Sequence, residues 1–96
     1  MGEEKIIRQH LTFYGRVQGV GFRYRAHWIA EELGLTGWVR NTFNDTVEME
    51  LQGTQELIAD MISRLNRQKW IYIDDITFKD IPVVEERAFR VMGGGW

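Results

Sequence analysis

The order of apolar and polar positions along the chain predicts an alternation of strands and helices. In residues 6–14 the apolar side chains share one parity and the more polar ones share the other, which is typical of a half-buried strand. In residues 22–33 the apolar side chains recur at the spacing of one helix face. Gly34 follows at a position where helices commonly end. The first third of the chain therefore predicts a strand followed by a helix.

The rest of the chain continues this alternation. Residues 36–41 and 46–52 predict a β-hairpin, because apolar and acidic residues alternate in the second segment. Thr54 is a suitable N-cap for a second amphipathic helix. The segments near residues 71–78 and 88–92 predict two further strands, of which the second is short.

The resulting order, β-α-β-β-α-β with a short extra C-terminal strand, predicts a ferredoxin-like α+β sandwich. In this fold an antiparallel sheet carries two helices on one face. The chain has 96 residues, which suits one domain, so we expect residues 1–96 to form a single domain. Since such a fold supports many functions, the function has to be argued from particular residues.

The composition narrows the class of protein. The chain has no cysteine, which argues against a disulfide scaffold or a thiolate metal site. It has no apolar run long enough to span a membrane, and its polar N-terminus lacks the apolar segment of a secretion signal. Its formal net charge of -2 argues against general nucleic-acid binding, which favours a basic surface. We therefore expect a cytoplasmic protein with neither a membrane nor a nucleic acid as partner.

The sequence GRVQGVGFR, which joins the first strand to the first helix, is the clearest candidate for chemistry. Backbone N–H groups at a helix start have no intrahelical partner, and glycines let an anion approach them closely. Arg23, in the first helical turn, adds a guanidinium that matches phosphate oxygens. The loop has neither the Gly-Lys-Ser/Thr of a P-loop nor a parallel βαβ context. Taken alone, it predicts either an anion site or a purely structural turn.

The wider context of this loop resembles the acylphosphatase family. GRVQGVGFR is followed by AEELGLTGWVRN and VEMELQG, and the resemblance is strong over residues 13–53. The family has the ferredoxin-like fold that the element order predicts. Its members hydrolyse the carboxyl–phosphate bond of acyl phosphates to a carboxylate and inorganic phosphate. The resemblance therefore implies an enzyme, an acylphosphatase, that acts on a small-molecule acyl phosphate.

The resemblance also implies roles for particular residues. The arginine matching Arg23 binds the phosphoryl group, and the asparagine matching Asn41 positions the attacking water. No metal, no cofactor and no covalent phosphoenzyme is implied. The predicted catalytic residues are thus Arg23 and Asn41, and a free phosphate or sulfate ion is expected to fit the same loop. The predicted phosphate-binding residues are Gly15, Arg16, Val17, Gln18, Gly19, Val20, Gly21, Phe22 and Arg23.

Two departures from the family pattern fall near these residues. The hairpin turn continues as Phe43-Asn44-Asp45-Thr46, where many members have Asp-Gly. We therefore expect a turn that is longer or differently shaped. Gly21 stands where relatives often have a bulkier residue, which is expected to give the loop more backbone freedom.

The remaining aromatic and histidine residues are given structural interpretations. Tyr24 and Trp28 lie one helical turn apart and off the apolar stripe, so we expect an exposed aromatic pair. His27 is expected on the polar side of the helix, away from the loop, and His10 within the first strand. Neither histidine is expected to hold a metal or to act as a base.

The alternative function is a non-catalytic ferredoxin-like module that binds an anion, a protein or RNA. The segment Lys69-Trp70-Ile71-Tyr72 favours this alternative, because basic and aromatic residues suit such contacts. The acidic charge balance counts against RNA. The expected oligomeric state is a monomer.

Overall fold

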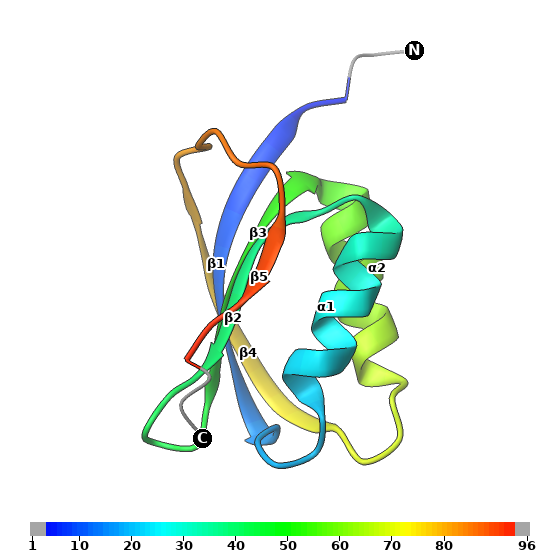
Figure 1. Ribbon diagram of the computed structural model, residues 1–96, viewed down its shortest axis with the longest axis vertical. Helices are drawn as coiled ribbons and strands as arrows, with labels where there is room; N and C mark the ends of the chain where they lie inside the picture. Colours follow the sequence, from blue (N-terminus) through cyan, green and yellow to red (C-terminus); the bar gives the residue numbers. More distant parts are fainter. Residues whose placement is uncertain (1–3, 94–96) are drawn as a thin grey trace.

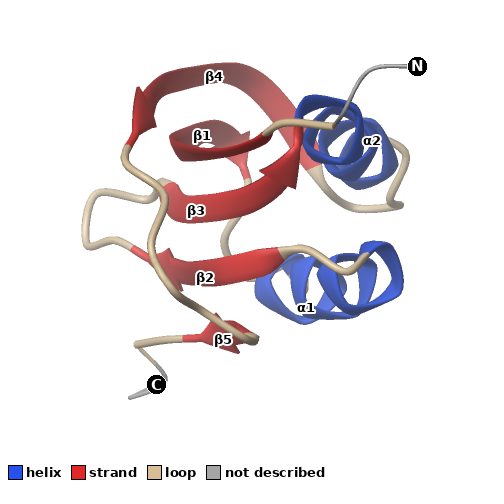
Figure 2. Cartoon of the chain, turned by 90° about the horizontal axis from the view of Figure 1, so that it is seen from above, coloured by secondary structure: helices blue, strands red, loops and turns tan. Residues whose placement is uncertain are grey.

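Two helices pack against one face of a five-stranded sheet, in the predicted element order (Figure 1). The computed structural model describes residues 4–93. Figure 2 shows both helices on one side of the sheet and the connection from the fourth strand to the fifth on the other. The elements are β1 (Ile6–Arg16), α1 (Phe22–Leu33), β2 (Thr36–Asn41), β3 (Val47–Thr54), α2 (Gln55–Asn66), β4 (Tyr72–Ile81) and β5 (Phe89–Val91).

The strand order is β4-β1-β3-β2-β5, and the first four strands pair antiparallel as the ferredoxin-like fold requires. The short fifth strand was predicted without a direction, and it pairs parallel with β2. The antiparallel sheet of the first four strands thus becomes a mixed sheet with this addition. The physical reason is the connection through residues 82–88, which crosses the sheet from the β4 edge to the opposite edge, so that β5 runs opposite to β4 and in the direction of β2 (Figure 2).

The strand limits show where the sequence pattern was weak. α1 has the predicted bounds, and Thr54 caps α2 by accepting a hydrogen bond from the backbone N–H of Leu57 at 3.2 Å. β4 extends to Ile81, beyond the predicted limit near residue 78. It is an edge strand with mostly exposed side chains, so no apolar alternation marks its end.

The hydrophobic core lies between the sheet and the two helices. Alternate residues of β3 are fully buried, and one stripe of each helix packs on them, because side chains alternate across a strand and repeat along a helix face. The largest of the fully buried side chains, each at most 2% exposed, are those of Phe13, Phe22, Leu11, Met49, Leu51, Met61 and Leu65.

The sheet face away from the helices carries a buried charge that the sequence pattern did not predict. Arg8 is only 4% exposed. Its guanidinium forms ion pairs with Glu50 at 2.8 Å and with Glu86 at 2.7 Å, and it also donates to Gln52 at 3.1 Å. Glu86 belongs to the connection between β4 and β5, so these contacts fix that connection across the sheet.

The protonation of this cluster follows from its contacts. Burial alone would raise the pKa of Glu50, but hydrogen bonds from His10 and Arg8 outweigh it and leave the pKa below its ordinary value of 4.5. Burial would lower the pKa of Arg8, whereas its bonds to Glu86 and Glu50 raise the pKa overall. Both groups are therefore held in their charged forms.

We predict that Arg8→Ala destabilises the protein by about 2 to 4 kcal/mol, because it leaves two partly buried carboxylates without their cation. Urea denaturation measures the change in the free energy of unfolding. The matched control is Arg40→Ala, which breaks an ion pair with Glu48 on the same sheet face at 49% exposure. That loss should be about 0 to 1 kcal/mol. Equal losses in the two variants would contradict the structural role given to Arg8.

A second prediction concerns acid stability. Because the folded pKa of Glu50 lies below its unfolded value, its stabilisation is present above pH 4.5 and is lost as the pH falls through the folded pKa. Glu50→Gln should therefore flatten the dependence of the free energy of unfolding on pH in the acidic range. The control is Glu31→Gln, on the exposed surface of α1, which should keep the wild-type dependence. Urea denaturation at a series of acidic pH values makes the comparison.

Candidate functional site

The glycine loop (residues 15–21) is shaped by its backbone at both ends. The register between β1 and β4 shifts at Tyr14/Gly15, and a Cβ atom at Gly15 would overlap the carbonyl oxygen of Tyr72. At the other end Gly21 is the N-cap of α1 and has a φ of 81°, in the left-handed region that favours glycine. A bulkier residue at Gly21 would have open space around it, so the backbone angle alone disfavours one there.

Two buried side chains anchor the glycine loop to the core. Val17 is 1% exposed and Phe22 is 2% exposed, and the ring of Phe22 packs against Phe13 with centroids 5.1 Å apart. Val20 is half-buried and also packs on the core. Among the predicted phosphate-binding residues, these three are therefore placed to contribute backbone groups, since their side chains serve the core.

Arg23 lies in the first turn of α1, next to the glycine loop. Its Nη1 donates to the backbone carbonyl oxygens of Met92 at 3.2 Å and of Gly93 at 3.4 Å, so the residues after β5 help to orient the guanidinium. The first turn of α1 contains no acidic residue. The positive end of the helix dipole and the guanidinium thus act at the same place, which favours a bound anion.

Asn41 is the last residue of β2, and it lies in the same pocket as Arg23. This pocket has a volume of about 470 Å³. The fold therefore places the two predicted catalytic residues, from α1 and β2, in one pocket with Gly19 and Gly21 of the glycine loop. The residues that line the pocket are Val17, Gly19, Gly21, Phe22, Arg23, Tyr24, His27, Asn41 and Val91.

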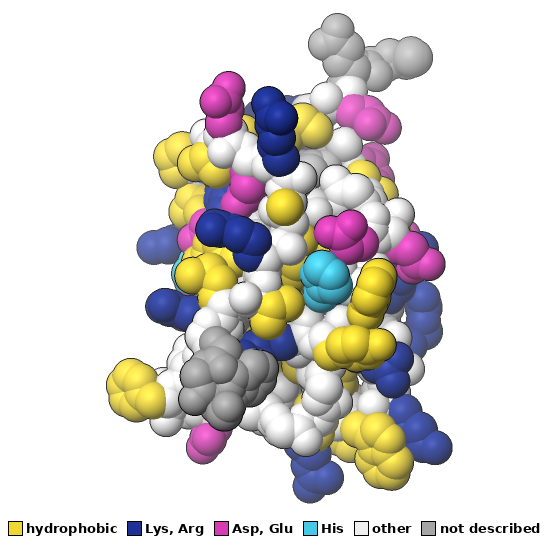
Figure 3. Space-filling model, in the orientation of Figure 1, with side chains coloured by type: hydrophobic (Ala, Val, Ile, Leu, Met, Phe, Trp, Pro, Cys, Tyr) yellow, Lys and Arg dark blue, Asp and Glu magenta, His cyan; other side chains and the backbone are white. Residues whose placement is uncertain are grey.

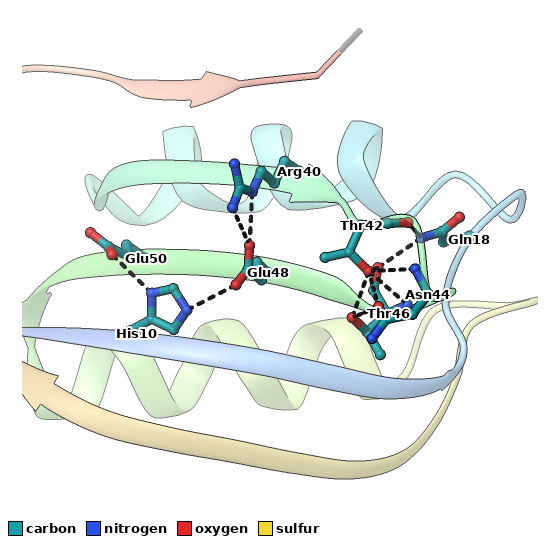
Figure 4. Close-up of polar contacts among 8 residues, drawn as sticks. All are labelled: His10, Gln18, Arg40, Thr42, Asn44, Thr46, Glu48 and Glu50. Carbon is teal, nitrogen blue, oxygen red and sulfur yellow. Dashed lines mark hydrogen bonds and ion pairs between the residues drawn. The ribbon is translucent and has the colours of Figure 1, made fainter. Parts of the chain in front are cut away.

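The hairpin turn after Asn41 is tied to the glycine loop by one side chain (Figure 4). Nε2 of Gln18 donates to the carbonyl oxygens of Thr42 and Thr46, each at 2.7 Å. Within the turn, the hydroxyl of Thr42 accepts from the backbone N–H of Thr46 at 3.2 Å and lies 2.8 Å from the Thr46 hydroxyl. Gln18 therefore fixes the distance between the glycine loop and the turn that follows Asn41.

The departure from Asp-Gly is accommodated within this turn. Asp45 has a φ of 71°, the left-handed angle that a glycine would adopt more easily. The Thr42 and Asn44 side chains close the turn with further hydrogen bonds, which include one from the Thr46 hydroxyl to Oδ1 of Asn44 at 3.1 Å. The turn is therefore closed largely by side-chain hydrogen bonds.

Arg16 lies apart from the pocket. It is exposed, its guanidinium lies 5.7 Å from the ring centroid of Tyr72, and it lines a separate shallow hollow with Tyr72 and Asp74. Of the two arginines that flank the glycine loop, only Arg23 therefore contributes to the pocket with Asn41.

His27 contradicts the expectation that it lies away from the glycine loop, because it lines the pocket with Arg23. Its Nδ1 is buried and has no hydrogen-bond partner within residues 4–93. The sequence could have predicted this position, because His27 follows Arg23 by four residues and side chains at that spacing share a helix face. His10 lies elsewhere, between Glu50 at 2.9 Å and Glu48 at 3.4 Å on the open sheet face (Figure 4).

Asn41 also borders a second hollow, of about 540 Å³, which contains neither the glycine loop nor Arg23. Its walls include Thr12, Arg40 and Glu48, and Arg40 and Glu48 form an ion pair at 2.7 Å. Because Arg40 is already paired to a carboxylate, this hollow is a weak candidate for an anion site.

Over residues 4–93, no group of three or more histidine, aspartate or glutamate residues is placed to hold a metal ion. In the same part of the chain no helix is long and apolar enough to cross a membrane.

Comparisons with known proteins identify the family of the chain. The family model described as Acylphosphatase matches residues 9–91. An acylphosphatase from Bifidobacterium longum is 37% identical over 89 residues, covering 90% of this chain and 92% of that one. Another, from Geobacillus thermodenitrificans, is 41% identical over 91 residues, covering 92% and 96% of the two chains. The solved structure of an acylphosphatase from Coxiella burnetii superimposes with a TM-score of 0.84 at 32% identity, covering 96% of this chain and 100% of that one.

We predict that Gln18→Ala lowers the free energy of unfolding by about 1 to 2 kcal/mol, because the part-buried bridge to the carbonyl groups of Thr42 and Thr46 is lost, and the Thr46 carbonyl keeps only its donors within the turn. Urea denaturation measures the loss. The matched control is Gln9→Ala, which removes an exposed hydrogen bond to Asp80 and should change stability by less than about 0.5 kcal/mol. A Gln18 variant as stable as the Gln9 variant would contradict the bridging role.

Proposed function

The chain belongs to the acylphosphatase family and hydrolyses the carboxyl–phosphate bond of acyl phosphates, and we propose that Arg23 and Asn41 are its catalytic residues. One observation carries this assignment of residues. Two polar side chains from separate elements line one pocket together with the glycine loop at the N-terminus of a helix.

In this proposal the phosphoryl group lies against the glycine loop. The backbone N–H groups of residues 15–21 and the first turn of α1 bind its oxygens, and the guanidinium of Arg23 covers it from the helix. An anionic phosphoryl group is a stronger acceptor for the guanidinium than the neutral carbonyls of Met92 and Gly93, because both partners then carry charge. Arg16, which lies outside the pocket, acts at most through the positive potential of its own charge near the glycine loop.

Asn41 orients the attacking water. The water oxygen bonds to phosphorus while the bond from phosphorus to the acyl oxygen breaks, and the electron pair of that bond leaves with the carboxylate. A carboxylate is a weakly basic leaving group, so positioning and charge stabilisation supply most of the catalysis. The amide of Asn41 cannot accept the proton of the water, and we assign that proton to a phosphoryl oxygen of the substrate.

The remaining properties form part of the same proposal. The reaction needs no metal and no cofactor, because the leaving carboxylate requires no Lewis acid. Residues 1–96 act as one domain, since one continuous core joins both helices to the sheet over the described residues, and a monomer is part of the same proposal. The lack of cysteine supports a cytoplasmic location.

A free phosphate or sulfate ion is expected to bind in the glycine loop. Membership of an enzyme family favours this function over a non-catalytic module.

We predict that the purified protein hydrolyses acetyl phosphate in the presence of EDTA, and that Arg23→Ala and Asn41→Ala lower kcat by about 100-fold or more. Phosphate release measures the rate, and isothermal titration with inorganic phosphate measures binding. Arg23→Ala should also abolish phosphate binding, whereas Asn41→Ala should keep it, because Asn41 acts on the water.

The matched control is Arg25→Ala, an exposed arginine in the same helix that does not line the pocket. It should keep the wild-type rate on acetyl phosphate. Urea denaturation confirms that each variant is folded. An Asn41→Ala variant with wild-type kcat, or activity that requires added metal, would contradict the proposed mechanism.

A further inference from the structure

The segment between α2 and β4 carries a tryptophan that the hydrolytic site does not use. The backbone N–H of Ile71 donates to the carbonyl oxygen of Gln68 at 3.3 Å, so Lys69 and Trp70 are the two central residues of a tight turn. Trp70 has a φ of 78°, in the left-handed region that glycine adopts easily and a tryptophan rarely does. Its side chain is 60% exposed, so burial does not offset the cost of this backbone angle. The turn therefore presents an exposed ring despite backbone strain.

A shallow hollow joins this turn to the exposed aromatic residues of α1. It has a volume of about 310 Å³, and its walls include Tyr24, Arg25 and Trp28 together with Gln68. Tyr24 is 62% exposed and Trp28 is 55% exposed, and their ring centroids lie 6.4 Å apart in an edge-on contact. The predicted exposed aromatic pair is thus confirmed. Because Gln68 is the first residue of the turn, the exposed rings of α1 and of the turn lie on neighbouring parts of the surface.

The same part of the surface carries cations. The guanidinium of Arg25 lies 5.8 Å from the ring centroid of Tyr24. Nζ of Lys69 lies 5.3 Å from the ring centroid of Trp70, and Arg67 is exposed at the end of α2. None of these three cations forms an ion pair within residues 4–93. We call the surface formed by Tyr24, Arg25, Trp28, Arg67, Lys69 and Trp70 the basic-aromatic surface.

The charge of this surface differs from that of the whole chain. The expectation of no nucleic-acid partner rests on the formal net charge of -2, which does not describe how the charges are distributed. Glu32, the carboxylate that lines the hollow, is paired with Arg64 at 2.9 Å and does not neutralise the three cations. Figure 3 shows Lys and Arg side chains beside hydrophobic ones at the lower right, with most of the visible Asp and Glu side chains higher up. The basic-aromatic surface is therefore locally positive.

We propose that the basic-aromatic surface binds single-stranded nucleic acid, as an activity separate from hydrolysis. Exposed aromatic rings stack on unpaired bases, and neighbouring cations bind the phosphates between them. A duplex hides the faces of its bases, so it would meet only the cations.

The exposure of the rings favours a strand over a membrane. The three rings are 55% to 62% exposed, so each lies partly against the protein. Phe43, at 101% exposure, projects fully into solvent, and it belongs to the hairpin turn outside this surface. Binding to a lipid surface requires apolar side chains that reach below the headgroups. Rings that lie partly against the protein suit stacking better than such insertion.

The experiment measures the fluorescence anisotropy of a labelled single-stranded RNA of about twelve nucleotides, within the usual site size, as protein is added. With three cations, the logarithm of the binding constant should fall with the logarithm of the salt concentration with a slope of about -2. Trp70→Gly should weaken binding by about fivefold or more, because one stacking ring is lost. The same variant should keep the wild-type urea midpoint and the wild-type rate on acetyl phosphate, because glycine adopts the turn angle without strain.

Three further variants separate the contributions. Lys69→Gln should make the salt slope shallower by about 0.7, because one phosphate contact is lost. The matched control is Phe78→Ala, which removes an aromatic side chain of 63% exposure on β4, outside the basic-aromatic surface, and should keep the wild-type affinity. Arg23→Ala should also keep it, because the strand does not occupy the catalytic pocket.

Several outcomes would overturn the proposal. These are no binding of the RNA by the wild type, unchanged affinity in Trp70→Gly, or a loss of affinity in Phe78→Ala or Arg23→Ala. Equal affinity for an RNA duplex of the same length would also do so, because stacking would then contribute nothing. Vesicles of phosphatidylcholine and phosphatidylserine are the second probe, and protein that sediments with them but does not bind RNA would show a membrane surface instead. Failure to hydrolyse acetyl phosphate would overturn the proposed function alone, since this inference is tested by binding.

Discussion

The contact between Phe13 and Phe22 is the constraint on which the site depends. The two rings flank the glycine loop in sequence, and they pack 5.1 Å apart in the core. Burial of both rings fixes the start of α1 against β1, so the intervening loop has to close over a short span. Arg23 directly follows Phe22, and the same contact therefore sets where its side chain leaves the helix. The hydrophobic core thus places the charged residue before any anion arrives.

The second half of the site comes from a different part of the chain and is aligned by polar contacts. Asn41 ends β2, and the register of β2 on β3 places it opposite Val47. Gln18 then joins the hairpin turn to the glycine loop through two carbonyl groups. A buried apolar contact sets one side of the pocket and a hydrogen-bonded bridge sets the other. This combination of an apolar contact and hydrogen bonds is expected in a rigid pocket whose backbone N–H groups must remain available to a ligand.

The predictable features are those that repeat along the chain. The stripe of α1 recurs over three turns, which is why its bounds follow from the sequence. The parallel direction of β5 did not follow, because a strand of three residues carries no pattern and its direction depends on the connection before it. The burial of Arg8 was also missed, since a single arginine in a strand has the same sequence pattern whether its partners are near or far. The meeting of Arg23 and Asn41 came from the family resemblance, because periodicity alone does not place two elements in contact.

The contact of Arg23 with the carbonyl groups of Met92 and Gly93 has a consequence for the synthesis of the protein. A nascent chain on the ribosome presents the glycine loop and α1 long before residues 89–93 leave the exit tunnel. Until then, β2 lacks its parallel neighbour and the guanidinium lacks two of its carbonyl partners. The pocket can therefore be assembled only after residues 89–93 have been translated and have left the tunnel. A nascent polypeptide that lacks this segment would present an incomplete pocket, so catalytic competence requires that the strand pair with β2 first.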